Sequence, residues 1–238
     1  MPRGYTYAST AKPAQLAEAS PGLTIGTFKD QPPWIVVDLS LESVTVASWP
    51  GKLWEVQVLH SASEQPRDGA GYIRATAVRV EQELPAGVIF GSNGLKVAEI
   101  LDRTLTLTLA ERDHLASRLD PASSQTFSVA WNRWLAWVDP ASPYREDDHR
   151  DTLAIPSTGK RSPVGPVFTV LYSVVKQRAR AIEGAAAFIA DDEGQSLAPA
   201  WASAFAALRH ACMAVGAASQ LLSEEERSLL SYGYEGLD

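Results

Sequence analysis

The chain has 238 residues, of which 45% are hydrophobic, and a formal net charge of −7. Its apolar content is sufficient for one large domain or two small ones, and its acidity disfavours non-specific contact with nucleic-acid phosphates. The only cysteine, Cys212, excludes an intrachain disulfide and a multi-cysteine zinc site. The absence of an apolar leader and of a window near the ~20 apolar residues of a membrane span predicts a cytoplasmic protein.

The segment 34–90 alternates apolar and polar side chains with a period of two, which is typical of strands with one buried face. Ile35, Val37, Leu39 and Leu41 are predicted to share one face of the first strand. The turn at Trp49–Lys52 predicts a hairpin between this strand and the next one. With Tyr72–Leu84 as a further strand, the pattern predicts an antiparallel β-meander of about four to six strands.

The segment 108–231 follows a helical period instead, and a short helix is predicted before it over Leu95–Asp102. Arg103–Leu109 fits either a strand or the entry of a helix. Capping boxes are predicted where Thr108 precedes Glu111 and where Ser223 precedes Glu226. Further helix starts are predicted at Asp120-Pro121, Pro166 and Pro199, because proline favours the first helical position. Two apolar stripes are predicted to face the core, namely Phe127, Trp131, Trp134 and Val138 on one helix and Trp201, Phe205, Leu208, Cys212, Val215 and Leu222 on another.

The fold class predicted from these patterns is α+β, with the β-meander followed by four to five α-helices. The helices are expected either to pack on the sheet or to form a layer of their own. We predict a single domain over 1–238. The alternative is a β-rich subdomain over 1–103 and a helical subdomain over 104–238.

The long connection 139–165 contains the charged cluster Arg145–Asp151, with the sequence REDDHRD. Loops of this length without structure of their own tend to be functional or disordered. The cluster has three interpretations: a metal or acid–base site, an acidic surface for a basic partner, or a solvated loop. The residues predicted to bind a partner are Trp137, Tyr144, Glu146, Asp147, Asp148, His149 and Asp151.

Trp137 belongs to this set because it falls off the apolar stripe of its helix, beside Arg133. An exposed tryptophan is a frequent anchor at protein interfaces. Packing of its ring against the rest of the chain is the alternative interpretation.

A turn with the sequence GSNG precedes a predicted helix and offers a weak anion site at Ser92, Asn93, Gly94 and Lys96. Free amides at a helix N-terminus attract anions. However, a dinucleotide fingerprint needs three spaced glycines, so a structural turn with an Asn or Ser cap is the favoured interpretation.

Two Glu-x-x-His segments, Glu111–His114 and Glu146–His149, have the spacing of metal ligands on a helix. Such a site also needs two further glutamates on facing helices, and the second segment lies in the presumed loop between Pro143 and Pro156, so we predict neither a metal nor another cofactor. His210 and Cys212 lie two residues apart on a predicted helix and therefore face different directions, which excludes a direct nucleophile–base pair.

Lys176, Arg178 and Arg180 form the densest basic patch. They are expected to pair with Glu183, to pair with the acidic cluster, or to make weak contacts with nucleic acid.

The sequence therefore predicts a cytoplasmic bacterial protein-interaction module, such as an inhibitor, an immunity-type protein or an adaptor, that binds a basic partner. The alternative is an enzyme that uses the 145–151 cluster or the 91–94 turn. Pairing of two copies through the Ala-rich helix 199–222 is compatible with either function. Membrane and nucleic-acid partners are not expected.

Overall fold

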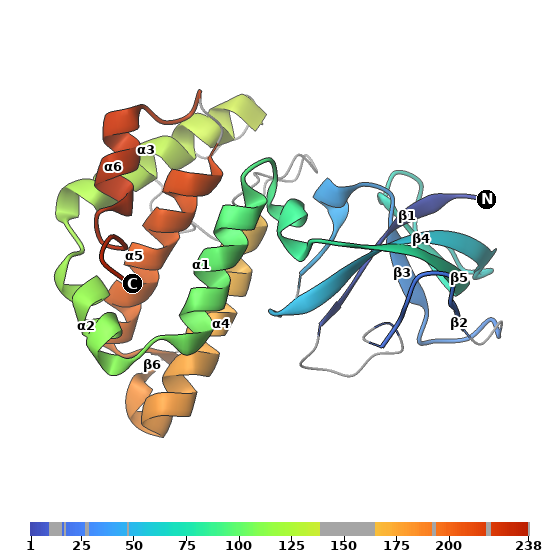
Figure 1. Ribbon diagram of the computed structural model, residues 1–238, viewed down its shortest axis with the longest axis horizontal. Helices are drawn as coiled ribbons and strands as arrows, with labels where there is room; N and C mark the ends of the chain where they lie inside the picture. Colours follow the sequence, from blue (N-terminus) through green and yellow to red (C-terminus); the bar gives the residue numbers. More distant parts are fainter. Residues whose placement is uncertain are drawn as a thin grey trace. The chain divides into compact units, whose positions relative to one another are not determined.

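The computed structural model describes residues 1–9, 16, 18–26, 29–46, 48–138, 165–191, 194–217 and 220–237. Contacts divide the chain into two compact units, Met1–Ile89 and Phe90–Asp238, called here the sheet unit and the helical unit (Figure 1). An antiparallel sheet is followed by helices, so the predicted α+β class is confirmed. The domain boundaries expected from the sequence stay a prediction, because a grouping by contacts does not test independent folding.

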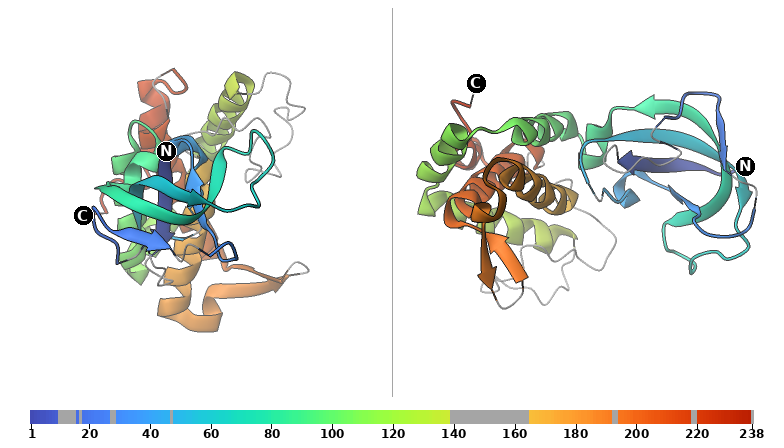
Figure 2. Two further views of the ribbon diagram at one scale, coloured as in Figure 1. Left: turned by 90° about the vertical axis from the view of Figure 1, so that its right-hand side faces the viewer. Right: turned by 90° about the horizontal axis from the view of Figure 1, so that it is seen from below.

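The sheet unit has five strands among its described residues, and all of their pairings are antiparallel. They are β1 (Arg3–Ser9), β2 (Thr24–Gly26), β3 (Ile35–Asp38), β4 (Gly51–Ser61) and β5 (Tyr72–Leu84). Short 3₁₀ turns occupy Leu41–Ser43 and Ala86–Phe90. The order is β2-β5-β3-β1-β4, and β5 also pairs with β4. The pairings β5–β3–β1–β4–β5 therefore close a small ring (Figure 2).

The predicted alternation in the fourth strand is confirmed. Trp54, Val56 and Val58 are buried, whereas Glu55 and Gln57 are half-exposed. The indole Nε1 of Trp54 donates a hydrogen bond to the carbonyl of Leu16 at 2.9 Å, which satisfies the one polar atom that this large ring buries. The inner face of β4 is therefore the centre of the sheet-unit core.

The connectivity differs from a simple meander. The predicted hairpin across Trp49–Lys52 is wrong, because β4 pairs with β1 and β5 rather than with β3. The strand β1, which the sequence interpretation missed, lies between β3 and β4. Gly4 on β1 allows this approach, since a Cβ there would lie 2.3 Å from the carbonyl oxygen of Asp38.

The predicted face of the β3 strand is wrong at Leu39. The strand ends at Asp38, and the Leu39 side chain is 49% exposed while Asp38 is buried. The backbone of Leu39 instead binds the carbonyl of Gly71. The alternation could not continue because the chain turns into the Leu41–Ser43 3₁₀ turn immediately afterwards.

Six α-helices lie among the described residues of the helical unit. They are α1 (Gly94–Thr106), α2 (Leu109–Ser117), α3 (Pro121–Val138), α4 (Gly165–Glu183), α5 (Pro199–Gly216) and α6 (Glu224–Ser231). A 3₁₀ turn at Gly184–Ala187 and a hairpin of β6 (Phe188–Asp191) and β7 (Gly194–Leu197) join α4 to α5. The sequence interpretation treated this hairpin as a linker. None of the helices described is both long and apolar enough to cross a bilayer.

The helix α5 forms the centre of this unit and contacts α1, α2, α3, α4 and α6 (Figure 1). Ala204, Ala207 and Ala211 are buried on it, and their small side chains let the neighbouring helices approach closely. The predicted seam is buried at Trp201, Leu208 and Cys212. The helix ends at Gly216, earlier than the predicted residue 222. The seam is thus occupied within one chain, and pairing of two copies through it stays a prediction.

The predicted helix starts in the helical unit are confirmed. Thr108 and Ser223 form capping boxes with Glu111 and Glu226, and an Asp120 oxygen accepts a hydrogen bond from the amide of Ala122. Each box is extended by an arginine, because Arg103 binds Glu111 and Arg133 binds Glu226. Backbone amides at these caps hold the pKa of both glutamates below the usual range.

We predict that Thr108→Ala lowers the free energy of unfolding by about 1 kcal/mol, because the hydroxyl cap of α2 is lost. Thr108→Ser keeps the hydroxyl and should remain close to the wild type. Urea unfolding followed by far-UV circular dichroism measures both. Equal stability of the alanine variant and the wild type would show that the cap does not stabilise α2.

Candidate functional site

Most residues predicted to bind a partner lie outside the described residues, namely Tyr144, Glu146, Asp147, Asp148, His149 and Asp151. The backbone of Trp137 belongs to the last turn of α3, but its side chain is not among those described. The structure therefore places the start of this candidate surface on α3 and leaves its partner-binding role a prediction.

The two helices that flank the segment 139–164 are joined by a buried aromatic cluster. Phe127 and Trp131 of α3 lie 5.5 Å and 5.3 Å, between ring centroids, from Phe168 near the start of α4. All three side chains are buried, and Trp134 extends the cluster at 4.8 Å from Trp131. Aromatic pairs at these distances add to the stability that burial already provides. The helix before the segment and the helix after it are thus packed against each other.

The cluster continues to His210 of α5, whose ring stacks on Phe127 at 5.1 Å. Its Nδ1 lies 3.2 Å from the hydroxyl of Ser123, which itself donates to the carbonyl of Asp120 at 2.7 Å. The hydroxyl proton of Ser123 is donated to this carbonyl, so the hydroxyl oxygen can only accept from His210. Nδ1 of His210 therefore carries the ring proton. The Nε2 lone pair then has no partner among the described residues.

This geometry argues against a serine nucleophile. A catalytic histidine accepts the serine proton, whereas here the proton points to a backbone carbonyl. Burial, with a smaller contribution from the neighbouring Arg209, lowers the pKa of His210 to about 3, so the ring is neutral. Sequence reasoning missed Ser123 as the partner of His210, since the two residues are 87 positions apart.

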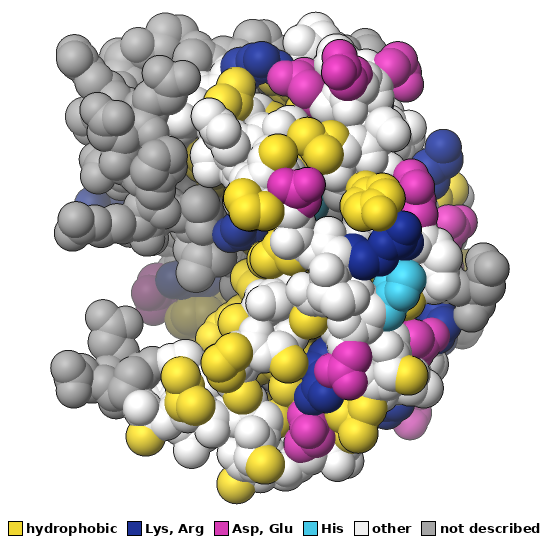
Figure 3. Space-filling view, turned by 90° about the vertical axis from the view of Figure 1, so that its left-hand side faces the viewer, with side chains coloured by type: hydrophobic (Ala, Val, Ile, Leu, Met, Phe, Trp, Pro, Cys, Tyr) yellow, Lys and Arg dark blue, Asp and Glu magenta, His cyan; other side chains and the backbone are white. Residues whose placement is uncertain are grey.

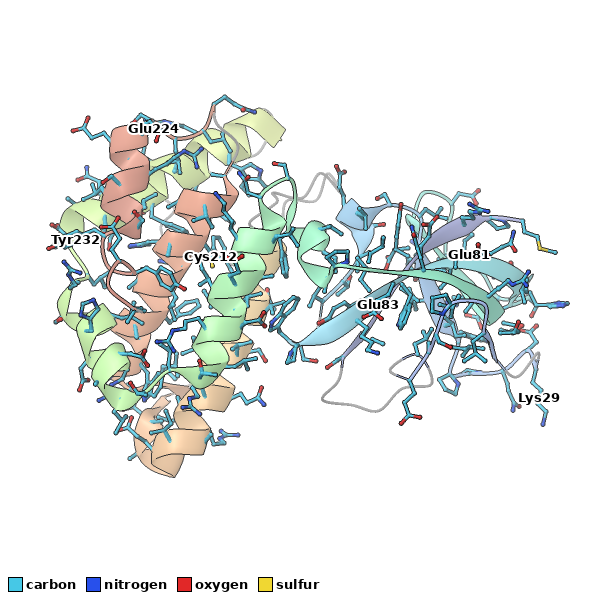
Figure 4. The ribbon with its side chains drawn as sticks, viewed as in Figure 1. Lys29, Glu81, Glu83, Cys212, Glu224 and Tyr232 are labelled. Carbon is cyan, nitrogen blue, oxygen red and sulfur yellow. The ribbon has the colours of Figure 1, made fainter. Side chains whose placement is uncertain are left out.

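Cys212 is buried on α5 among the surrounding helices (Figure 4). Burial raises the pKa of its thiol, which keeps the sulfur protonated and unreactive. The prediction that Cys212 fills the core as a small apolar side chain agrees with this position.

The Gly91–Gly94 turn has the geometry of a structural turn. The amide of Gly94 donates to the carbonyl of Gly91 at 2.9 Å, and Gly91 has a φ of 93°. Asn93 occupies the N-cap of α1, but its side chain makes no capping hydrogen bond. Ser92 and Lys96 are exposed, so their proposed role in binding an anion stays a prediction.

The first Glu-x-x-His segment is used for structure. Glu111 caps α2, and His114 lies 3.2 Å from the carbonyl oxygen of Glu235 near the C-terminus. Arg118 donates to the same carbonyl and covers the ring of Tyr232 (Figure 4). Within the described ranges, no group of three His, Cys, Asp or Glu side chains is placed to hold a metal ion.

Glu183 at the end of α4 does not pair with the basic patch. Its carboxylate binds Arg112 of α2 at 2.6 Å and also accepts from the indole Nε1 of Trp201 on α5. The Arg112 guanidinium lies over the Trp201 ring. The predicted pairing of Glu183 with Lys176, Arg178 or Arg180 is therefore wrong, because side chains from two other helices, α2 and α5, bind the same carboxylate.

The basic patch itself divides between two sides of α4. Arg178 donates to the carbonyls of Leu107 and Thr106, where it caps the end of α1. Lys176 and Arg180 lie over the ring of Phe188 on β6, and Lys176 also lies over Tyr172. Tyr172 meets Phe205 of α5 edge to face at 5.2 Å, and Phe205 contacts Arg209.

These contacts define a cation–aromatic row in which charged heads and rings follow one another across α4, β6 and α5. Its members are Arg180, Phe188, Lys176, Tyr172, Phe205 and Arg209. Each cation–ring contact contributes about 0.5–1 kcal/mol at an exposed site. Sequence reasoning found Lys176 and Arg180 but not their contact with Phe188, because this ring comes from an element later in the chain.

No family model matches the chain, and searches of the curated proteins and of the solved structures found no match either.

We predict that the low pKa of His210 makes the helical unit lose stability as the pH falls from 6.5 towards 3. The unfolded chain binds a proton at the ordinary pKa of 6.5, whereas the folded chain binds it only near 3. Between pH 6.5 and 5 the loss should reach about 1.6 kcal/mol.

Urea unfolding of the wild type and of His210→Gln across this window measures the effect. The two capping glutamates titrate below it, so their contribution is small there. The variant should show a flatter dependence on pH. A slope equal to that of the wild type would contradict a buried, neutral His210.

Proposed function

We propose that this protein is a cytoplasmic bacterial protein-interaction module that acts as an inhibitor, an immunity-type protein or an adaptor. It binds a basic partner protein through the acidic cluster of residues 145–151, with Trp137 as an apolar anchor. The cluster supplies charge complementarity, which sets the association rate and the choice of partner. The tryptophan supplies area that becomes buried on binding.

One observation supports the proposal: the two helices on either side of the acidic segment are held together by buried aromatic contacts. The buried contacts of Phe127 and Trp131 with Phe168 fix α3 against α4 on either side of the segment. In the first turn of α6, Glu226 is bound at both carboxylate oxygens by Arg133 of α3. Binding loops are typically carried in this way, on scaffolds that do not move when the loop meets its partner.

The surface of the helical unit supports a local rather than a general electrostatic attraction. On the face drawn in Figure 3, Lys and Arg side chains lie close to Asp and Glu side chains. The electrostatic potentials of such neighbouring opposite charges cancel at distances beyond the Debye length of ~8–10 Å. The 145–151 cluster contributes three consecutive acidic residues, Glu146, Asp147 and Asp148, which provide a local attraction for a basic partner.

The enzyme alternative would use the 145–151 cluster or the Gly91–Gly94 turn, and it stays a prediction. The arrangement of His210, Ser123 and Cys212 adds no support for it. All three side chains are buried, and the hydroxyl of Ser123 donates its proton to the backbone carbonyl of Asp120.

The test begins with capture of partners on the tagged full-length protein from its native host, followed by mass spectrometry. Association with the captured protein is then measured by surface plasmon resonance at two salt concentrations. The variant Asp147→Lys, Asp148→Lys, Asp151→Lys should slow association by on the order of tenfold at low salt and less at high salt.

A matched control reverses the exposed glutamates Glu83, Glu224 and Glu225, which changes the net charge by the same amount elsewhere (Figure 4). This control should change association by much less than the loop variant. If the two variants behave alike, only the net charge matters and the 145–151 cluster is not the interface.

A further inference from the structure

We propose that the cation–aromatic row is a second docking surface, which binds an acidic, extended segment of a partner protein. It is separate from the proposed role of the 145–151 cluster, because its charge is opposite and its residues come from α4, β6 and α5.

Two cations of the row, Lys176 and Arg180, have no acidic partner among the described residues. Neither Lys176 nor Arg180 forms an ion pair with any carboxylate of the described residues, although the chain carries a net charge of −7. The nearest acidic residue on the same helix, Glu183, is already bound by Arg112 and Trp201. Within the described part of the chain, the donors of both cations therefore stay open to an added carboxylate.

The rings hold these cations in place. Arg180 lies 4.9 Å from the centroid of Phe188 and also reaches the side-chain oxygen of Gln195 at 3.4 Å. Lys176 lies 5.3 Å from the centroid of Tyr172. A long side chain that is already positioned loses less conformational entropy when it binds, so these heads are prepared for an anionic group.

The spacing favours an extended segment rather than a single ion. Lys176 and Arg180 are one helical turn apart, which corresponds to roughly 6 Å along α4. Acidic side chains two residues apart on an extended peptide project to the same side at roughly 6.6–7 Å. Alternate carboxylates of one strand-like segment can therefore meet both cations.

The same contacts disfavour nucleic acid as the occupant. Single strands bind by stacking bases on aromatic faces. Here Phe188, Tyr172 and Phe205 each already meet a cation of the chain at a ring face. The net charge of −7 also opposes the approach of a phosphate backbone.

The experiment uses the full-length protein and three fluorescein-labelled probes in anisotropy titrations at low and high salt. The probes are a short peptide in which Glu alternates with Ser, the same peptide with Gln in place of Glu, and a single-stranded oligothymidylate. We expect salt-dependent binding of the acidic peptide and much weaker binding of the other two. No binding of the acidic peptide at low salt, or tighter binding of the oligothymidylate, would overturn the proposal.

Variants locate the binding. Lys176→Gln with Arg180→Gln should weaken binding of the acidic peptide about fivefold to thirtyfold, as expected for two partly exposed ion pairs. Lys176→Arg with Arg180→Lys keeps both charges and should restore most of the affinity. Comparison of these two double variants distinguishes a loss of affinity caused by the missing charges from one caused by damage to the fold.

Two controls complete the design. Arg79→Gln removes an exposed cation of the sheet unit and should leave the affinity unchanged. Asp192→Asn with Glu193→Gln removes acidic groups between β6 and β7 in the sequence, and it should not weaken binding. Equal loss of affinity in Arg79→Gln and in the row variant would mean that the peptide senses only overall charge, which would contradict a defined surface.

Discussion

The close packing of α5 is the constraint on which the rest of the helical unit depends. Its alanines let five other helices reach its backbone closely, and the few large side chains are placed between them. The polar contacts at one end reinforce this arrangement, because Glu183 of α4 receives Arg112 of α2 and Trp201 of α5 together. Loss of the carboxylate would leave the guanidinium and the indole N–H without their shared acceptor.

The proposed binding surfaces follow from that packing. Phe127, Trp131 and Phe168 hold α3 against α4, the two helices between which the acidic segment lies in the sequence. Once α4 and the β6–β7 hairpin are held together, through Phe188, the positions of Lys176 and Arg180 are set. The same helices thus flank the acidic segment in the sequence and position the basic side chains of the cation–aromatic row.

Features that depend on local sequence could be predicted. The capping boxes at Thr108 and Ser223 involve residues only three positions apart, and the period of the stripe through Trp131 and Trp134 is a property of one helix. These patterns also predicted the α+β class, because a period of two gives way to a helical period near residue 100.

Features that join distant parts of the chain could not be predicted. The pairing of β1 with β4 places Tyr5 opposite Glu55, and nothing in the sequence of either strand indicates the other strand as its partner. The hairpin of β6 and β7 is too short for its period to stand out, and its Gly194 adopts a φ of 128° only in context. The same holds for the candidate surfaces, since Ser123 finds His210 and Lys176 finds Phe188 only after the helices have packed.

Hydrogen–deuterium exchange of the full-length protein, with and without its captured partner protein, tests the central claim most directly. An interaction module built on the α3–α4 framework should gain protection in the segment 139–164 and in the adjoining turns of α3 and α4. The strands of the sheet unit should exchange as before. Protection confined to the sheet unit, or no change anywhere in the helical unit, would contradict the claim that this framework displays the binding surface.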